Sequence, residues 1–484
     1  MMKVLVLNPP FKFRISRDSR WPEFTKTGTL YYPFWLSYCA GVLLENNHEV
    51  LLIDAIAKDW GVEKTIREIK GFNPELLVME TVTPTIYNDI KFVEELKKKM
   101  PRMKTVLVGT HVSALPEETL KLSKSIDFIV RREYDYTILE LANTLEKNKD
   151  VKNIEGISYR KGNEIIHNKD REFIQNLDEL PFISKVYKKF LNIRDYRYAL
   201  AQHPMIQIWS SRGCPNRCTF CQIPQTFMSR TFRARSPENF VEELEWIKKN
   251  LPEVKEVFIE DDTFTTDKER VEKICYLIIK KKLKITWSAN VRADLSYDLM
   301  KKMKEAGCRM LIVGYESGNQ KILNNIKKGI TLEMAEEFTK NAKKTGLKIF
   351  GCFMIGLPGD TKKTVDETFE YAKKLNPDMA FFQQAVPFPG TELYNWVKEN
   401  DYLTVKDWSD WLDDNGQLDC IISYPWLTNK EIRGLRDKFT IQFYLSPKHL
   451  WEEFKRNLSL SEQVRLMKAR FDYLKYLIKG GMKR

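Results

Sequence analysis

The stretch SSRGCPNRCTFC, residues 210–221, gathers three of the chain's eight cysteines, Cys214, Cys218 and Cys221, into eight positions. The other five cysteines are scattered singly along 484 residues, which does not indicate a disulfide framework. Three thiolates at spacings of four and three residues can bind one metal centre from a single loop. No fourth cysteine lies nearby, and no histidine follows until His449. The stretch therefore predicts a metal site with three cysteine ligands and an open position.

Around this stretch, six short apolar runs typical of β-strands alternate with helical segments. The runs begin at Met205, Val254, Ile285, Met310, Lys348 and Asp378. The cysteines follow the first run, and most of the polar and glycine-rich sequence follows the other runs. β/α-barrel enzymes carry their sites at these strand ends. Six such units predict a partial (β/α)6 barrel over residues 201–395 rather than a closed eight-stranded barrel.

The number and type of ligands favour an iron–sulfur cluster over zinc. Structural zinc takes four protein ligands, and catalytic zinc usually recruits histidine or carboxylate. A [4Fe–4S] cluster binds thiolates, and three of them leave one iron open. CPNRCTFC, with the aromatic Phe220 before its last cysteine, resembles the signature of the radical S-adenosylmethionine (SAM) superfamily. The resemblance implies that the open iron chelates SAM, whose reductive cleavage yields a 5′-deoxyadenosyl radical. A structural zinc loop is the alternative interpretation.

Further motifs follow the strand-like runs in the order of that superfamily: EVFIEDDTFT, NVRADL, GYESG and IGLPGD. The resemblance implies that SAM contacts Phe220, Glu260, Asp261, Asp262, Arg292, Glu316, Ser317, Gly356, Pro358 and Gly359. The acids suit an ammonium group and the arginine suits a carboxylate. Each motif alone is weak, whereas the ordered set is a strong signal. Cys352, in phase with Met354 on the fifth run, is a candidate hydrogen donor, although a lone strand cysteine is more often core.

Residues 1–150 also alternate between strand-like and helical segments, which predicts a doubly wound, Rossmann-like parallel sheet. VLVLNPP, HEVLLIDA, VLVGTHVSALPEETL and IDFIVRREYDYT resemble the cobalamin-binding domain that precedes the barrel in one radical SAM class, so the resemblance covers about residues 1–395. In that class the corrinoid lies at the carboxyl edge of the sheet, which makes Asn8, Gly109 and His111 candidate contacts. No Asp-x-His-x-x-Gly segment supplies an axial histidine, so we expect cobalamin bound without a histidine ligand.

The remaining segments are expected to connect the domains and to cover the barrel. Residues 151–200 read as a connector with a hairpin at Lys161–Asn163. Residues 396–484 read as a mainly helical, basic C-terminal region. Its tail carries an apolar stripe at helical spacing, formed by Leu460, Val464, Met467, Phe471, Leu474 and Ile478. The stripe predicts a helix that docks on the barrel or lies on a membrane surface.

Charge and hydropathy favour a cytoplasmic protein. Lys and Arg outnumber Asp and Glu by 79 to 66, a net charge of +13 that suits an anionic partner or a solvated surface. The longest apolar run, residues 31–44, is too short to span a bilayer. The N-terminus leads directly into a strand-like run, so no signal peptide is expected. We therefore expect a cytoplasmic location, extended to the inner face of the membrane if the tail helix binds lipid.

Within the superfamily, the wording of the barrel motifs is most similar to enzymes that make cyclitol-ether lipid head groups, of the hopanoid and calditol types. This resemblance implies radical ring contraction of a lipid-linked sugar at the membrane surface. It also implies an external electron donor of the flavodoxin or ferredoxin type and no nucleic acid partner. Exposed aromatic residues in the C-terminal region, Trp396, Trp408, Trp411 and Trp426, would assist membrane contact.

Three other functions are consistent with parts of the pattern. A cobalamin-dependent radical SAM C-methyltransferase would produce S-adenosylhomocysteine together with 5′-deoxyadenosine, whereas rearrangement would produce 5′-deoxyadenosine alone. A methylthiotransferase acting on tRNA would need a second cysteine trio in the front domain, where only Cys39 occurs. The last alternative is a non-enzymatic protein that merely binds an iron–sulfur cluster.

Overall fold

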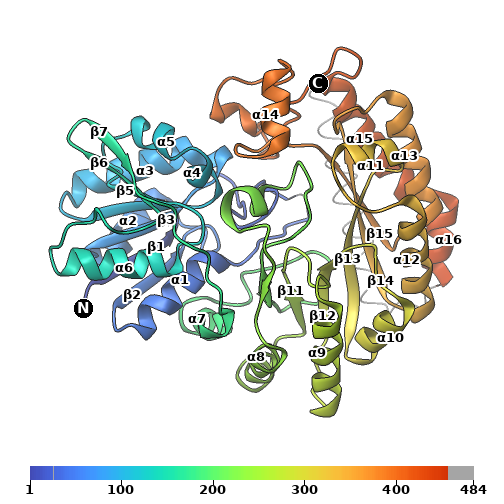
Figure 1. Ribbon diagram of the computed structural model, residues 1–484, viewed down its shortest axis with the longest axis horizontal. Coiled ribbons are helices and arrows are strands. Elements are labelled where there is room, and N and C mark those ends of the chain that lie inside the picture. The colour runs from blue at the N-terminus through green and yellow to red at the C-terminus, as the bar shows by residue number, and fades with distance from the viewer. Residues whose placement is uncertain (26, 456–484) are drawn as a thin grey trace.

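Two sheets lie next to each other in the computed structural model, one mainly parallel and one fully parallel, each with helices packed against it (Figure 1). The structure describes residues 1–25 and 27–455, so the apolar stripe predicted from Leu460 to Ile478 lies outside the described residues. The front sheet has seven strands and the second sheet has six. This arrangement confirms the predicted α/β class, with a Rossmann-like front domain followed by a partial barrel.

The front sheet has the strand order β2-β1-β3-β4-β5-β6-β7. Its parallel strands are β1 (Lys3–Asn8), β2 (Glu49–Asp54), β3 (Leu76–Glu80), β4 (Lys104–Val108) and β5 (Phe128–Val130). Neighbouring residues of β1 pack on opposite faces, Val4 and Val6 in one core and Leu5 and Leu7 in the other. Because helices cover both faces, the strands are apolar throughout.

The helices of the front domain divide between these two cores. On one face lie α1 (Phe34–Glu45), α6 (Asp135–Glu146) and α7 (Ile183–Phe190). On the other lie α2 (Val62–Phe72), α3 (Ile86–Lys99), α4 (Thr110–Ala114) and α5 (Pro116–Leu122). Phe34 to Val42 are buried along α1. This burial explains the apolar character of the run, which is too short to span a membrane.

The segment that we expected to be a connector, residues 151–200, builds part of the front domain. Its hairpin, β6 (Ile157–Lys161) and β7 (Glu164–His167), pairs antiparallel with β5 and extends the sheet. Gly162 closes the hairpin at φ +61°. Farther on, Arg197 forms a bridge with Leu30 in the long loop after β1. The segment therefore belongs to the packed structure of both domains rather than to a free linker.

The second sheet is a parallel, open barrel with its strands in sequence order (Figure 1). The strands are β8 (Met205–Ile208), β11 (Glu256–Ile259), β12 (Trp287–Val291), β13 (Cys308–Glu316), β14 (Lys348–Ile355) and β15 (Met379–Gln384). The helices between them are α8 (Pro237–Asn250), α9 (Lys268–Lys280), α10 (Tyr297–Glu305), α11 (Gln320–Asn325), α12 (Leu332–Thr345) and α13 (Lys362–Leu375). All six predicted strands are present, which confirms the (β/α)6 architecture.

The C-terminal region closes the edge of the barrel and reaches the front domain. Its helices are α14 (Glu392–Glu399), η4 (Trp408–Trp411), α15 (Asn429–Tyr444) and α16 (Pro447–Lys455). Phe439 of α15 stacks on Phe369, and Phe443 contacts Phe382 of β15. The expectation of exposed aromatic residues is right for Trp426 and wrong for Trp411, while Trp396 and Trp408 are partly buried. Trp411 is 1% exposed, and the ring of Trp408 packs edge-on against His111 of the front domain, whereas Trp426 is 47% exposed.

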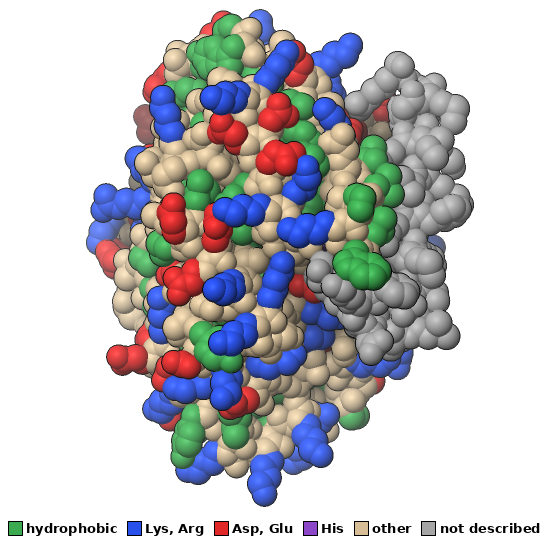
Figure 2. Space-filling view, turned by 90° about the vertical axis from the view of Figure 1, so that its right-hand side faces the viewer, with side chains coloured by type: hydrophobic (Ala, Val, Ile, Leu, Met, Phe, Trp, Pro, Cys, Tyr) green, Lys and Arg blue, Asp and Glu red, His purple; other side chains and the backbone are tan. Residues whose placement is uncertain are grey.

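The outer surface of the barrel carries both charges. Figure 2 shows Lys and Arg side chains interspersed with Asp and Glu over this face, rather than a single basic patch. Many of these charges form pairs, such as Lys373 with Glu370 and Lys374 with Glu336. Among the helices of the described residues, none has the length and apolar character needed to cross a bilayer.

Candidate cluster and cofactor site

The cysteine loop follows β8 and is anchored by Asp261 at the end of the neighbouring strand. The carboxylate of Asp261 accepts the backbone N–H groups of Ser210 (2.6 Å) and Ser211 (3.2 Å). It also accepts both serine hydroxyls, at 2.5 and 2.6 Å. All three residues are buried. Asp261 therefore fixes the start of the loop, and both of its oxygens are engaged.

Gly213, directly before the first cysteine, allows the loop to turn tightly. Its φ of +82° lies in the left-handed region, and a Cβ there would lie 2.2 Å from the carbonyl oxygen of Thr231. The N–H of Cys214 donates to the carbonyl of Ser229 at 3.1 Å. Residues 229–231 thus hold the loop from the other side, which directs the three thiols into one region.

The three thiols lie in a largely buried environment with charges of both signs nearby. Cys214 and Cys218 are buried and Cys221 is partly exposed. Burial raises the pKa of Cys218 and Cys221, while Lys328 and Arg292 lower that of Cys218 and Arg20 lowers that of Cys221. Asn216 donates to Cys214 Sγ at 3.2 Å. Cations and amide donors oppose the effect of burial, but the pKa of Cys218 and that of Cys221 are raised overall, and Asp262 adds to the rise at Cys221.

The residues fit a [4Fe–4S] cluster better than a single ion. Within residues 1–25 and 27–455, no three Cys, His, Asp or Glu side chains converge on one metal position. A four-iron cluster does not require such convergence, because each thiolate binds a different iron. Structural zinc would require it.

The two other acids of the EDD triplet, Glu260 and Asp262, face a cation from the front domain. Arg20, in the loop between β1 and α1, lies 2.5 Å from Glu260 Oε1 and 3.2 Å from Asp262 Oδ1. Gln207 donates to the other oxygen of Glu260 at 3.2 Å. Asp262 Oδ2 is buried and has no hydrogen-bond partner among the described residues. Burial raises the pKa of both carboxyls, and Arg20 opposes that rise.

The next two strand ends bring a second ion pair to the same region. Glu316, at φ +64°, pairs with Lys328 at 2.6 Å, and both side chains are buried. Arg292 donates to the carbonyl oxygens of Lys328 (2.6 Å) and Gly329 (3.3 Å). Ser317 Oγ accepts the N–H of Asn319 and lies 3.1 Å from Thr368 Oγ1. The structure therefore places Arg292 and Glu316 together, close to Cys218, while Ser317 organises the turn into α11.

The Gly-Leu-Pro-Gly-Asp turn after β14 is a tight, covered loop. Asp360 accepts the N–H groups of Gly356 and Leu357, both at 3.0 Å, and burial raises its pKa to about 6. Gly356 and Gly359 have φ of +83° and +91°. Tyr424 of the C-terminal region donates its hydroxyl to the carbonyl oxygen of Gly356 at 2.8 Å. Pro358 accepts from Asn325 at 2.9 Å, and Phe220, partly buried, packs against the barrel core.

Cys352 lies on β14 near the same charges. Its thiol is influenced by Glu316, Lys328 and Arg20, and burial raises its pKa to about 12. Cys352 pairs with Gly314 on β13. A Cβ at Gly314 would lie 2.1 Å from Glu316 Oε1 and 2.8 Å from Lys328 Nζ, so this face of the two strands is the side that carries the Glu316–Lys328 pair, the barrel interior. The predicted inward orientation of Cys352 agrees with these contacts.

The candidate cobalamin residues lie at the carboxyl edge of the front sheet. Asn8 donates to Asp54 Oδ1 at 2.9 Å and accepts from Arg17 at 2.7 Å. Gly109 has φ +113°, and a Cβ there would lie 2.5 Å from the carbonyl oxygen of Thr81. These contacts fix the backbone at the ends of β1, β3 and β4. The side chain of Asn8 is fully engaged in these hydrogen bonds within the front domain.

His111, two residues after Gly109, is fully buried. Its Nδ1 lies 3.0 Å from Thr83 Oγ1, and its Nε2 has no hydrogen-bond partner within the described chain. Burial lowers the pKa of His111 to about 3, so the imidazole is neutral at physiological pH. A neutral ring with one unused nitrogen can donate to or accept from a ligand at this edge.

Several other buried polar atoms near the strand ends of both sheets lack partners within the described residues. They are the Tyr134 hydroxyl, Trp209 Nε1, Thr219 Oγ1, Gln222 Nε2 and Asp262 Oδ2. Buried polar groups normally have partners. SAM offers an ammonium and a carboxylate, and the corrin ring offers amide side chains, so both groups fit this region chemically.

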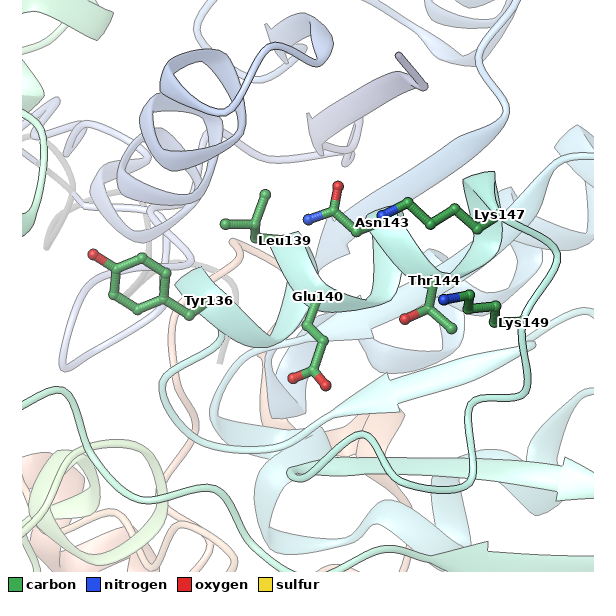
Figure 3. A pocket seen from close by; sticks show the side chains of 7 residues that line it. All are labelled: Tyr136, Leu139, Glu140, Asn143, Thr144, Lys147 and Lys149. Atoms are coloured by element: carbon green, nitrogen blue, oxygen red, sulfur yellow. The ribbon is translucent and has the colours of Figure 1, made fainter.

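Arg20, Arg17 and Lys328 belong to this region, and the sequence interpretation missed them. Trp408 also belongs to it, although the sequence interpretation placed it among exposed aromatic residues for membrane contact. The available signal for Arg17 and Arg20 was a long loop after a parallel strand, rich in arginine, where ligands bind in doubly wound folds. Two surface hollows in the described part of the chain lie elsewhere. One, of about 260 Å³, is lined by side chains of α6 and the loop after it, which Figure 3 shows, and another, of about 570 Å³, adjoins Tyr402 and Tyr424.

Comparison with known proteins agrees with this geometry. The chain matches the B12 binding domain over residues 24–142 and the radical SAM superfamily over residues 210–372. An uncharacterized methyltransferase of Pyrococcus horikoshii is 33% identical over 451 residues, covering 93% of this chain and 94% of that protein. The anaerobic magnesium-protoporphyrin IX monomethyl ester cyclase of Rubrivivax gelatinosus is 27% identical over 373 residues, covering 75% and 65%.

Among solved structures, the radical SAM methyltransferase TsrM of Kitasatospora setae, with cobalamin and a [4Fe–4S] cluster bound, has the same fold. The TM-score is 0.72 at 14% identity, over 92% of this chain and 89% of that one. None of these three proteins is named as a cyclitol-ether or calditol enzyme, so they do not support the lipid resemblance. The likeness to the Pyrococcus protein runs through both domains. The chain therefore belongs to the radical SAM superfamily, with a B12-binding domain before the barrel, and its cofactors are a [4Fe–4S] cluster, SAM and cobalamin, as the sequence predicted.

Proposed function

We propose that this protein is a cobalamin-dependent radical SAM methyltransferase. The observation that carries the proposal is the likeness, over nine tenths of both chains, to a protein named as a methyltransferase. The fold shared with a second methyltransferase supports it. This proposal replaces the ring contraction of a lipid-linked sugar as the main interpretation.

The proposed cluster ligands are Cys214, Cys218 and Cys221, which leave one iron for SAM. Asp262 is the best acceptor for the SAM ammonium, because Oδ2 is buried and has no partner in the described chain. The oxygens of Asp261 and Glu260 are already engaged. Arg292, held by the carbonyl oxygens of Lys328 and Gly329, would supply a positive charge for the SAM carboxylate.

The other barrel contacts proposed for SAM are Phe220, Glu316, Ser317, Gly356, Pro358 and Gly359. Glu316 suits a ribose hydroxyl as an acceptor, and Gly356 and Gly359 permit the positive φ angles of the turn proposed to lie beside the adenine. The tight turn held by Asp360 gives that backbone a fixed shape. These roles follow the family resemblance, and the contacts above show that the residues are held in place.

On the front domain, Gly109 lets the turn after β4 pack closely on Thr81 at the edge proposed for cobalamin, and His111 Nε2 offers the cofactor a hydrogen bond. We propose that the cobalt has no histidine ligand. Cobalamin, when bound, supplies the methyl group for transfer to an unactivated carbon. The chain's own residues position SAM and cobalamin from opposite strand edges and exclude water from the interface, where Trp209 and His111 are buried.

An electron must reach the cluster from outside, so we propose a flavodoxin or ferredoxin as a partner. No nucleic acid is needed. The product assay below tests whether the substrate is a lipid. A lipid substrate would place the enzyme at the inner face of the membrane.

The test is an anaerobic assay with the holoenzyme reconstituted with its cluster and hydroxocobalamin, a strong reductant, and SAM labelled with a deuterated methyl group as the only source of methyl groups. Lipid and water-soluble metabolite extracts serve as separate substrate pools. We expect equal amounts of S-adenosylhomocysteine and 5′-deoxyadenosine, with a labelled methyl group in one product. If 5′-deoxyadenosine forms without S-adenosylhomocysteine and an unlabelled lipid product accumulates, the enzyme catalyses a rearrangement and the proposal is wrong.

A further inference from the structure

The loop between β1 and α1 extends from the front domain to the barrel, and Arg20 is its point of contact. Its guanidinium reaches four oxygens at the end of β11. They are Glu260 Oε1 at 2.5 Å, the Glu260 carbonyl at 3.1 Å, the Asp261 carbonyl at 3.3 Å and Asp262 Oδ1 at 3.2 Å. The arginine side chain is 25% exposed, whereas those of Glu260 and Asp262 are 2% and 3% exposed.

The same loop is fixed to the front domain three residues earlier. Arg17 pairs with Asp89 at 2.6 Å, both side chains being almost fully buried. It also donates to Asn8 Oδ1 (2.7 Å) and to the carbonyl of Pro9 (2.9 Å). Arg20 therefore projects from a rigid base, so its position at the barrel is determined by the front domain.

The contacts of Arg20 leave the two oxygens of Asp262 in different states. Oδ1 accepts from Arg20, and Oδ2 is buried without a partner in the described residues. Because Oδ1 is held by Arg20, the carboxylate of Asp262 cannot rotate freely. The direction of Oδ2 is therefore fixed as well. We propose that Arg20 is a positioning residue for SAM, through which the front domain fixes Asp262 so that Oδ2 meets the SAM ammonium. This inference rests on the SAM contact proposed for Asp262.

The chemistry of arginine suits this role better than that of lysine. A guanidinium is planar and offers donors in a fixed fork, so one side chain can hold two carboxylates and two carbonyls at once. An ammonium is a compact charge that cannot span the same set. Arg20 also balances part of the negative charge of Glu260 and Asp262, which would otherwise stand unpaired in a buried site.

The test measures SAM binding to the holoenzyme, with cluster and cobalamin loaded, by anaerobic calorimetry. The variants are Arg20→Gln, Arg20→Lys and, as matched control, Arg14→Gln. Arg14 lies on the same loop but pairs with the exposed Asp59 of the front domain at 3.5 Å. Partners of this kind typically change affinity by about 10-fold or more when removed. We expect SAM to bind about 10-fold more weakly to Arg20→Gln, several-fold more weakly to Arg20→Lys and unchanged to Arg14→Gln.

Two further measurements separate positioning from general damage. Cobalamin affinity, followed by absorbance, should be the same in all variants. The electron paramagnetic resonance signal of the reduced cluster should shift on SAM addition in the wild type and less in Arg20→Gln. If Arg20→Gln binds SAM within twofold of the wild type, the inference is wrong. If Arg20→Gln does not fold, Arg20→Lys decides, and wild-type affinity there overturns positioning by the fork.

The failure of the SAM contact itself would be distinguishable. Asp262→Asn removes the charge of the proposed acceptor without changing its size. If this variant binds SAM as tightly as the wild type, the role of Asp262 under the proposed function is wrong. If it binds weakly while Arg20→Gln binds normally, only the role of Arg20 is wrong.

Discussion

The carboxyl edges of the two sheets contribute to one interface, but they hold their polar groups in opposite ways. At the front edge, Arg17, Asp89 and Asn8 satisfy one another in a closed network. At the barrel edge, Glu260 and Asp262 depend on Arg20 from the other domain, and Asp262 keeps an oxygen unused. The Arg17 network is therefore satisfied within the front domain, whereas Glu260 and Asp262 gain their cationic partner only from the front domain.

This difference indicates how each edge recognises its cofactor. The unused groups at the front edge, such as His111 Nε2 and the Tyr134 hydroxyl, are neutral. The barrel edge offers thiols, Asp262 and Arg292. Neutral groups suit the amides of a corrin, and charged groups suit the zwitterionic end of SAM. Substitutions at the barrel edge should therefore have the larger effects on SAM chemistry.

The largest effect is expected from the cluster ligands. Cys→Ala at Cys214, Cys218 or Cys221 removes one of three thiolates, so the cluster should be lost or unstable and SAM cleavage abolished. Iron content, visible absorbance and 5′-deoxyadenosine formation check this. The matched control is Cys275→Ala, in the buried face of α9, which should keep its cluster. A variant of the trio that still cleaves SAM would contradict the assignment.

Asp261→Ala should have the next largest effect, because it withdraws the anchor of the cysteine loop. Four donors of Ser210 and Ser211 lose their acceptor, and each unsatisfied buried donor costs about 1–3 kcal/mol. We expect a lower unfolding midpoint and a large drop in bound iron after reconstitution. Asp267→Ala, which removes the N-cap of α9, should cost about 1 kcal/mol without loss of iron. Equal iron content in both variants would show that Asp261 does not hold the loop.

The contrast between these residues also shows what the sequence could reveal. The cysteines are local in sequence, and the strands are short apolar runs that alternate with helical segments, so both the cluster loop and the sheets were predictable. Glu260, Asp261 and Asp262 look equivalent in the sequence. Successive residues of extended chain point to opposite sides, and in the structure Asp261 meets the cysteine loop while its two neighbours meet Arg20.

The remaining features depend on contacts between residues far apart in the chain. Arg20 and Glu260 are separated by 240 positions, and Trp408 meets His111 across nearly 300 residues. Neither contact leaves a periodic or spacing signal in one sequence. The hairpin at residues 157–167 was visible, but its membership in the front sheet depends on pairing with β5, which the local sequence does not specify.

A moderate, pH-dependent effect is expected at the front edge. Burial raises the pKa of Glu80 to about 7, and Asp18 beside it also has a raised pKa because of burial. A buried carboxyl whose pKa is raised favours folding while it is protonated. Its contribution to the free energy of unfolding is therefore full below the pKa of the carboxyl in the unfolded chain and is lost as the pH rises through about 7. The protein without cofactors should lose roughly 1–3 kcal/mol between pH 5 and 8. Urea unfolding across that range measures the slope.

Glu80→Gln imitates the protonated carboxyl at every pH, so this variant should be more stable than the wild type at pH 8 and should show a shallower slope. Glu49→Gln, at a side chain that is 41% exposed, should retain the wild-type slope. A wild-type slope in Glu80→Gln would show that other groups of the front edge carry the pH dependence.

The smallest effect is expected from Cys352→Ser, and it sharpens the choice between transfer and rearrangement. Burial raises the pKa of Cys352 to about 12, so at neutral pH this inward-facing residue carries an S–H that could give up a hydrogen atom. Methyl transfer needs no such donor, because the substrate radical is consumed by forming the new carbon–carbon bond. We therefore expect labelled product per 5′-deoxyadenosine within twofold of the wild type. If SAM is cleaved normally but product is lost, a radical must be quenched by this thiol, and the rearrangement becomes the better interpretation.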